Sequence, residues 1–448
     1  MIKLSKINEK NFFFICVLSL FIINLAFFFL TRNNSWVSDD FDYIFGSKLY
    51  NLVNNTNFFF EISQSRYDPL FLLINQIIPE NYLTWHLIVI FFYFLSGVLF
   101  YLILNSLFKN SKFAFFSAIL FTLNFSISLK SLSWAIFYSH IFNLFLGLLS
   151  LLLLIQIIKK NNLFLIFLYL LICIANVSIS EGSLIYAIVN LLFYYFFLRN
   201  ENNFINNFKN VLLIFVPLIY FMLINLFLFS SPAKILQDRI EIKNKKNYEE
   251  IFTKNSNNET YYYRSTYSPR NLKGFAFKLG DNVLNSLNLT ILTKNHEVFD
   301  ISKKNKDFIK KNYLNILIIL LIILVFVLFY LLILFKNKNK LKGYKFDLLF
   351  YFVILFLYTF IYARTDINLV LSIASAMLIS KLSLDLWNLN KKIISSLFII
   401  IFLFPTIIGS FNGFNRFGNF VSEQNISDFK KLEQKTKVTY DSNFFLDN

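Results

Sequence analysis

Long apolar runs separated by short polar segments dominate the hydrophobic pattern of the chain. Most runs approach the ~20 residues that an α-helix needs to cross the ~30 Å hydrocarbon core of a bilayer. The pattern predicts about eleven transmembrane helices, at residues 11–30, 82–104, 113–129, 139–158, 163–178, 183–198, 211–229, 313–335, 346–362, 367–387 and 393–410. We therefore expect an all-α polytopic membrane protein.

Composition narrows the class in the same direction. Hydrophobic residues make up 56% of the 448 positions and charged residues only 15%, against about 25% charged residues in a soluble domain. The 10 glycines and 6 prolines are few, which argues against collagen-like or turn-dense all-β chains. The composition thus argues against a water-soluble enzyme.

Basic residues predict the orientation of the helices. The formal charge is +17, and cytoplasmic loops of membrane proteins carry an excess of Lys and Arg. Every second short loop is basic, with Lys3, Lys6, Lys10, Lys109, Lys112, Lys159, Lys160, Arg199, Lys209, Lys336, Lys338, Lys340, Lys342, Lys345, Lys391 and Lys392. The alternate short loops carry only Lys130 and Arg364. We expect a protein of the bacterial inner (plasma) membrane, with the N-terminus cytoplasmic and the C-terminus outside.

This topology divides the chain into four parts. Residues 1–229 form an N-terminal membrane module that includes a first external loop at 31–81. A large external loop follows at 230–312, then further membrane helices at 313–410 and a short external tail at 411–448. The four tryptophans fall near predicted helix ends, as expected for interfacial anchors, at Trp36, Trp85, Trp134 and Trp387.

Two stretches of the external loops show the spacing of amphipathic helices. The first loop has apolar residues at Phe41, Ile44, Phe45, Leu49, Leu52 and Val53. The large loop has them at Leu272, Phe275, Leu279, Val283 and Leu287. Both stretches predict helices that lie in the outer membrane surface.

An acidic cluster in the first external loop is the strongest candidate for chemistry. Asp39, Asp40 and Asp42 follow the first helix by eight or more residues. Neighbouring carboxylates raise one another's pKa, so one can act as a general base while another orients a hydroxyl or holds a divalent cation. A structural alternative stays open, because Asp also caps the start of a helix.

Other polar residues lie at the predicted external helix ends. Arg66 is suited to bidentate contact with phosphate, although an interfacial arginine fits equally. His140 opens the fourth helix, Glu181 lies in the turn between the fifth and sixth, and Arg364 in the turn between the ninth and tenth. These charged residues either contact a substrate or pair with each other at the external end of the helix bundle. His86 is interpreted as an interfacial hydrogen-bonding residue.

Several familiar signatures are absent from the sequence. It has no Gly-rich phosphate loop, no H-E-x-x-H, no G-x-S-x-G and no C-x-x-C. Cys16 and Cys173 both fall inside apolar runs and are interpreted as packing residues. No predicted cytoplasmic segment is large enough for a nucleotide-binding domain, so an activated membrane substrate or an ion gradient would have to supply energy.

Three stretches carry a family resemblance: Tyr-Asp-Pro-Leu at 67–70 with Trp85-His86, Ala-Ile-Leu-Phe-Thr-Leu-Asn at 118–124 with Ser133-Trp134, and Ser180-Glu181. With the aspartate pair after the first helix and Arg364 before a late one, their order resembles the GT-C superfamily of integral membrane glycosyltransferases. The resemblance covers residues 10–200 in some detail and only the architecture thereafter.

The resemblance implies a GT-C-like bundle that transfers a hexose or pentose from a polyprenyl-phosphate donor to a lipid, glycan or protein acceptor outside. Asp39 or Asp40 would deprotonate the acceptor hydroxyl, with Mg²⁺ or Mn²⁺ bound there as in some members. Arg66, His140 and Arg364 would contact the donor phosphate. Asp42 and Glu181 would bind the sugar or the acceptor. Membrane lipids are the other expected partner, and nucleic acid is not one.

Two alternatives remain open at this point. A polysaccharide polymerase or ligase would place its essential arginines and histidines in the 230–312 loop. A lipid or glycan flippase or transporter would place charged residues near the middle of membrane helices. Lys381 and Asp385 lie four residues apart near one end of the tenth helix and are interpreted as an i,i+4 pair.

Overall fold

A computed structural model describes part of the chain. The described residues are 9–31, 70, 73–74, 77–78, 81–124, 132, 138–199, 204–229, 252–254, 260–262, 279–280, 282–283, 286–288, 338–360, 369–388, 392–393, 395–396, 399–400 and 402–403. The chain divides into two compact units. Unit 1 comprises residues 1–118, 129–230 and 412–448, and unit 2 comprises residues 119–128 and 231–411.

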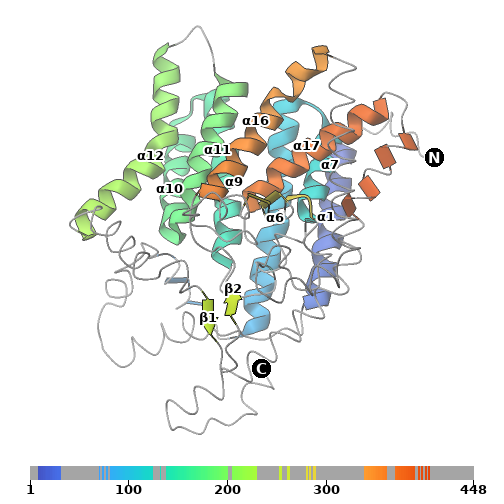
Figure 1. Cartoon of the computed structure of the whole chain (residues 1–448). Coiled ribbons are helices and arrows are strands. Elements are labelled where there is room, and N and C mark those ends of the chain that lie inside the picture. The colour runs from blue at the N-terminus through green and yellow to red at the C-terminus, as the bar shows by residue number, and fades with distance from the viewer. Residues whose placement is uncertain are drawn as a thin grey trace. The chain divides into compact units, whose positions relative to one another are not determined.

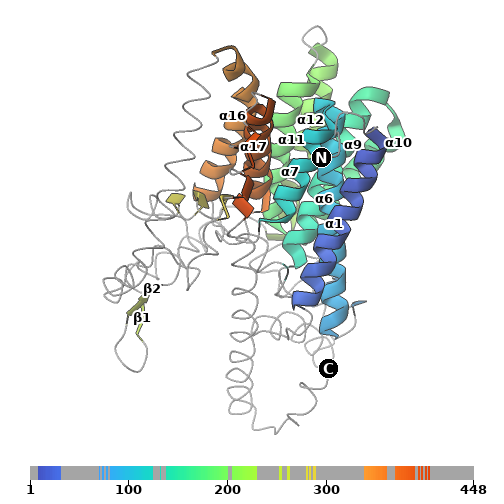
Figure 2. The same cartoon turned by 90° about the vertical axis from the view of Figure 1, so that its right-hand side faces the viewer.

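The described part of unit 1 is helical (Figure 1). Its elements are α1 (Glu9–Thr31), α6 (Tyr82–Phe108), α7 (Ser111–Thr122, whose last turn passes into unit 2), α9 (Tyr138–Lys160), α10 (Leu163–Ile179), the 3₁₀ turn η5 (Glu181–Leu184), α11 (Ile185–Phe193), the π turn η6 (Tyr194–Leu198) and α12 (Phe204–Phe229). The α9 helix packs against both α6 and α10, and α1 lies along α6 (Figure 2).

Asparagine caps and residues with a left-handed backbone conformation set the boundaries of these helices. The Asn81 side chain accepts a hydrogen bond from the Thr84 amide at the start of α6, and Asn162 accepts one from Phe164 at the start of α10. Such caps satisfy amide groups that lack a partner in the first turn. The helices α6 and α9 each end before a residue in the left-handed region, Lys109 (φ 49°) and Asn161 (φ 44°). This conformation terminates a helix and allows a tight reversal.

Unit 2 contains a helix pair, short helical pieces and a small ribbon. The helices are α16 (Lys338–Phe360) and α17 (Leu369–Asn388), which pack against each other. The strands β1 (Phe252–Lys254) and β2 (Thr260–Tyr262) pair antiparallel, with Thr253 opposite Tyr261. Helical residues also occur within 279–288 and within 392–403.

The predicted helical membrane protein is confirmed, while the count of eleven spans stays a prediction. Every predicted span except 313–335, which lies outside the described residues, coincides with helical residues. Among the described residues, five helices are long and apolar enough to cross a membrane: Asn11–Phe29, Tyr82–Phe108, Tyr138–Lys160, Ile205–Leu223 and Leu369–Asn388. The shorter apolar helices are Ser111–Thr122, Leu163–Ile179 and Gly182–Leu198.

Two predicted boundaries were wrong where polar contacts explain the difference, and a third was wrong because the span predicted at 346–362 begins eight residues earlier, at Lys338. The span predicted at 113–129 ends at Thr122, where Asn124 leaves the helix and its side chain donates to the Ser286 carbonyl oxygen at 3.1 Å. The span predicted at 211–229 begins seven residues earlier, at Phe204. Its polar first turns are held because the Tyr194 hydroxyl donates to Asn207 Oδ1 at 2.6 Å. Polar side chains with tertiary partners thus moved both boundaries away from the ends of the apolar runs.

The prediction for Trp85 was also wrong. Its side chain is fully buried in unit 1, with its ring centroid 4.6 Å from that of Tyr138. Trp85 therefore joins α6 to α9 instead of facing the membrane interface. Trp387 is partly exposed beneath the Lys392 ammonium, and Trp36 and Trp134 lie outside the described residues.

Candidate functional site

The structure describes two of the predicted site residues. His140 is half-buried in the first turn of α9, and Glu181 is the first residue of η5, where the backbone is described. Five others lie outside the described residues: Asp39, Asp40, Asp42, Arg66 and Arg364. The amphipathic helix predicted after Asp42 also lies outside them.

A buried histidine joins the last residue of α1 to the start of α6. Thr31 Oγ1 lies 2.5 Å from His86 Nε2, and both side chains are buried. The imidazole stacks between the rings of Phe28 and Tyr82, each with a centroid separation of 5.7 Å. His86 thus forms a hydrogen bond, as predicted, but it is buried within unit 1 instead of lying at the membrane interface, and it contacts the end of α1.

The start of α9 lies at this same end of unit 1, which we call the His86 end. The contact between Trp85 and Tyr138 joins the first turns of α6 and α9. The turn η5 packs against α9 and α10, and Ser180 Oγ accepts a hydrogen bond from the Gly182 amide. His140 and Glu181 therefore both belong to the His86 end, where α1 also finishes.

Basic residues gather at the opposite end of unit 1. Lys159, near the end of α9, donates to Ser106 near the end of α6 at 2.8 Å. Lys209, near the start of α12, donates to Asn161 at 3.4 Å. These bonds bring three of the predicted basic loops together. The alternation of basic and non-basic loops in the sequence thus corresponds to two distinct ends of unit 1.

Polar side chains that were not predicted as site residues lie where α9, α10 and α11 pack together. Asn190 of α11 donates to Ser150 of α9 at 3.1 Å, and Tyr169 of α10 lies beside Asn190. A second set of polar residues lies nearer the His86 end. Asn143, Asn176 and Ser183 are each seven residues from Ser150, Tyr169 and Asn190, respectively.

This second polar layer differs from the first in its hydrogen bonding. Asn143, Asn176 and Ser183 are all buried, and in the described part of the chain their side-chain oxygens have no hydrogen-bond partner. Such groups are rare and costly in folded proteins. Asn143 lies on α9, Asn176 on α10 and Ser183 in η5, which packs against both helices. Those oxygens can accept hydrogen bonds from a hydroxylated group.

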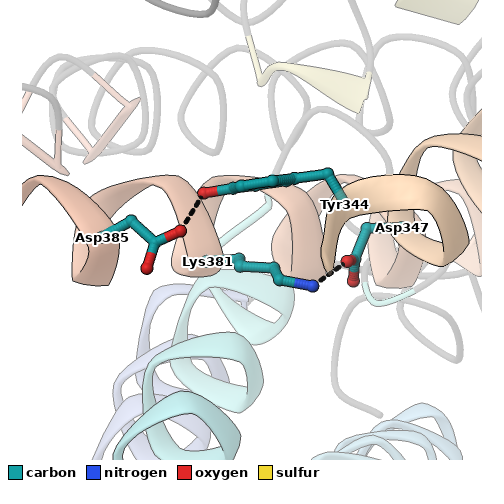
Figure 3. Close-up of polar contacts among 4 residues, drawn as sticks. All are labelled: Tyr344, Asp347, Lys381 and Asp385. Carbon is teal, nitrogen blue, oxygen red and sulfur yellow. Dashed lines mark hydrogen bonds and ion pairs between the residues drawn. The ribbon is translucent and has the colours of Figure 1, made fainter. Parts of the chain in front are cut away.

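A separate polar cluster joins α16 to α17 in unit 2 (Figure 3). Lys381 forms an ion pair with Asp347, and the Tyr344 hydroxyl donates to Asp385 Oδ2 at 2.5 Å. The Lys381 ammonium also lies 5.0 Å from the centre of the Tyr344 ring. Lys381 and Asp385 therefore find their close partners on the neighbouring helix, which corrects their interpretation as an i,i+4 pair.

Asp347 and Tyr344 are the residues of this cluster that were not predicted from the sequence. Asp347 is fully buried, whereas the Lys381 side chain is 22% exposed. A lysine and an aspartate inside two consecutive apolar runs were the available signal, because a charge at such a position requires a partner.

Metal binding has no candidate among the described residues, which contain no group of three or more His, Cys, Asp or Glu side chains suited to it. The two cysteines are buried, as predicted for packing residues, and Cys173 belongs to an apolar cluster formed by α9, α10 and α12. No family model matches the sequence, and no curated protein matches it.

Proposed function

We propose that this protein is a membrane glycosyltransferase that moves a sugar from a polyprenyl-phosphate donor to an acceptor on the outer face of the membrane. Asp39 or Asp40 is the proposed base, and the resemblance to GT-C enzymes is the reason for choosing this reaction class. A membrane substrate that carries its own activated phosphate also agrees with the absence of nucleotide-binding motifs in the sequence.

One observation supports this proposal above the others. The last residue of α1 is bonded to His86 at the end of unit 1 that also holds His140 and Glu181. Asp39 follows Thr31 by eight residues, a chain length that reaches at most about 29 Å. This length keeps Asp39 within reach of the end of unit 1 that holds His140 and Glu181, and the described basic residues Lys159 and Lys209 lie at the opposite end.

The proposed reaction requires few protein groups. The acceptor oxygen attacks the anomeric carbon, the bond from that carbon to the phosphate oxygen breaks, and polyprenyl phosphate leaves with the electron pair. An aspartate takes the hydroxyl proton. His140, with Arg66 and Arg364, would stabilise the charge on the departing phosphate, and Asp42 and Glu181 would orient the substrates.

Amide substitutions at the aspartates test the proposal. Asp39→Asn, Asp40→Asn and the double variant are compared in a deletion strain by the amount of modified cell-surface glycan. Glu61→Gln, in the same predicted loop, is the matched control for the loss of one carboxylate. We expect a loss of at least 100-fold in one single variant and in the double variant, the order of a general-base contribution, with normal membrane levels. Full activity in the double variant would refute the assignment.

A lipid or glycan flippase is the second candidate, and the α16–α17 cluster favours it. Lys381 lies seven residues from the end of α17, about 10 Å inside a helix long enough to span the membrane. A buried charge pair at such depth is what a transporter would use. Loss of glycan export in Asp347→Asn with sugar transfer intact would support this function over the first.

A further inference from the structure

A short segment of unit 2 buries its polar side chains. Within residues 279–288, positions 279–280, 282–283 and 286 are helical, and the Leu287 amide donates to the Val283 carbonyl. Asn282 and Ser286 are fully buried, and four-residue spacing places them on one helix face. The sequence predicts here a helix on the membrane surface with water on its polar side. Asn282 and Ser286, two further polar residues of this stretch, are instead buried against the protein.

Hydrogen bonds align this segment with α16. Asn282 Nδ2 donates to Thr359 Oγ1 at 3.2 Å, and Ser286 Oγ lies 2.8 Å from the Tyr351 hydroxyl. Tyr351 precedes Thr359 by eight residues, or about 12 Å along the helix. The segment therefore runs antiparallel to α16, away from the Phe360 end. Tyr351 lies nine residues from that end, about 13 Å.

A second set of contacts gives an independent estimate of how far the C-terminal end of this segment lies from the helix ends. Asn288 Nδ2 donates to the Phe402 carbonyl oxygen at 3.5 Å, and Ser395 Oγ donates to the Ser383 carbonyl oxygen at 2.7 Å. Ser383 lies about 7 Å from the Asn388 end of α17, and the described residues between Ser395 and Phe402 are helical, so the helical rise over seven residues adds about 10 Å. Phe402 therefore lies about 18 Å from that end of a helix about 30 Å long, or about 12 Å below its other end.

We propose that residues 279–288 form a re-entrant helix, which enters the membrane from the outer side along α16 and ends near mid-depth. The α17 helix is long and apolar enough to span, so its length provides the scale. Both estimates place the C-terminal end of the segment about 12–13 Å below the outer ends of α16 and α17. The proposal is independent of the glycosyltransferase function.

The hydrogen bonds of the backbone polar groups agree with this position inside the membrane. Polar backbone groups at membrane depth must find partners within the protein. The Ser286 carbonyl accepts from the Asn124 side chain at 3.1 Å, and the helix ends at Asn288 in the left-handed region, with φ 61°. Asn288 is itself fully buried. The polar residues of the segment thus supply the contacts that a break in a helix requires inside a bilayer.

The remaining chain length allows a return to the outer side. Residues 289–312 comprise 24 positions before the predicted span 313–335, enough for about 80 Å when extended. The 230–312 segment would then contribute a wall inside the membrane next to α16, in addition to its external part. The predicted orientation of the later helices is unchanged.

A distance measurement in the full-length protein tests the proposal. Spin labels are placed at Leu287→Cys and Asn388→Cys, with Cys16 and Cys173 replaced by alanine. The control pair is Leu369→Cys with Asn388→Cys, the first and last residues of α17. We expect the 287–388 separation to be about 12 Å shorter than the control separation. Equal or longer separation would place Leu287 at the surface and overturn the proposal.

Hydrogen exchange of the wild-type protein in nanodiscs provides a second measurement that needs no substitution. Amides of residues 283–288 should exchange as slowly as those in the middle of α17. A surface helix would exchange several orders of magnitude faster than α17. Rapid exchange of this segment, with α17 protected, would overturn the proposal even if the labelled variants failed to fold.

Discussion

The ion pair between Asp347 and Lys381 predicts an asymmetric response to the loss of either partner. Asp347 is fully buried and the Lys381 side chain is 22% exposed. Lys381→Met leaves a carboxylate without a counter-charge in the apolar interface of α16 and α17 (Figure 3). Asp347→Asn leaves a lysine whose flexible chain can extend its ammonium toward the membrane surface.

The magnitudes follow from this difference in burial. An uncompensated buried charge costs about 3–5 kcal/mol, so Lys381→Met should lower the free energy of unfolding by at least ~3 kcal/mol. Asp347→Asn loses a charged hydrogen bond while keeping a side chain of the same size, for which we expect about 1–2 kcal/mol. The double variant Asp347→Asn/Lys381→Met should be more stable than Lys381→Met alone, because no unpaired charge remains.

Equilibrium unfolding in mixed micelles, followed by circular dichroism, measures these differences. Lys345→Met is the matched control, because Lys345 is an exposed lysine near the same end of α16, and it should change stability by less than about 0.5 kcal/mol. If Lys381→Met were no more destabilising than Lys345→Met, or less so than Asp347→Asn, the reasoning from burial would be refuted.

Two further substitutions probe contacts of unit 1 by thermal unfolding. Gly147→Ala would place a methyl group 2.2 Å from the ring of Tyr186, and we expect a cost of about 1–3 kcal/mol from overpacking; an unchanged melting temperature would contradict the close approach of α9 and α11. Thr31→Val removes the hydroxyl that contacts His86 and should cost about 1–3 kcal/mol, whereas Thr31→Ser should be nearly neutral; equal effects of the two would argue against the bond.

Helix positions could be predicted from the sequence because apolar runs have a length set by the bilayer. The helix predicted at 139–158 corresponds to α9 (Tyr138–Lys160), and that at 163–178 to α10 (Leu163–Ile179). The predicted end at residue 129 was wrong because the Asn124 side chain finds its hydrogen-bond acceptor in the backbone carbonyl of Ser286, far along the chain. The sequence around Asn124 does not reveal a hydrogen-bond partner 162 residues away.

From the sequence, the candidate site residues could be selected and assigned to one end of the helices, but their burial and contacts could not be predicted. Alternating charge placed His140 and Glu181 at one end, and the packing of η5 against α9 agrees with this. The burial of Trp85 contradicted the expectation of an interfacial tryptophan, and the burial of Asn282 could not be read from the sequence. Tryptophan is common at interfaces and asparagine favours water, but ring packing against Tyr138 and a hydrogen bond to Thr359 decide these two positions.

The most direct test of the glycosyltransferase proposal is release of polyprenyl phosphate from a sugar-labelled donor. Purified full-length protein in nanodiscs is given polyprenyl-phosphate sugars and an extract of membrane acceptors, and labelled sugar is followed from donor to product. We expect transfer by the wild-type protein and by Glu61→Gln, with loss of transfer in Asp39→Asn/Asp40→Asn. Undiminished transfer by the double variant, or label that stays on every donor with wild-type protein, would contradict it.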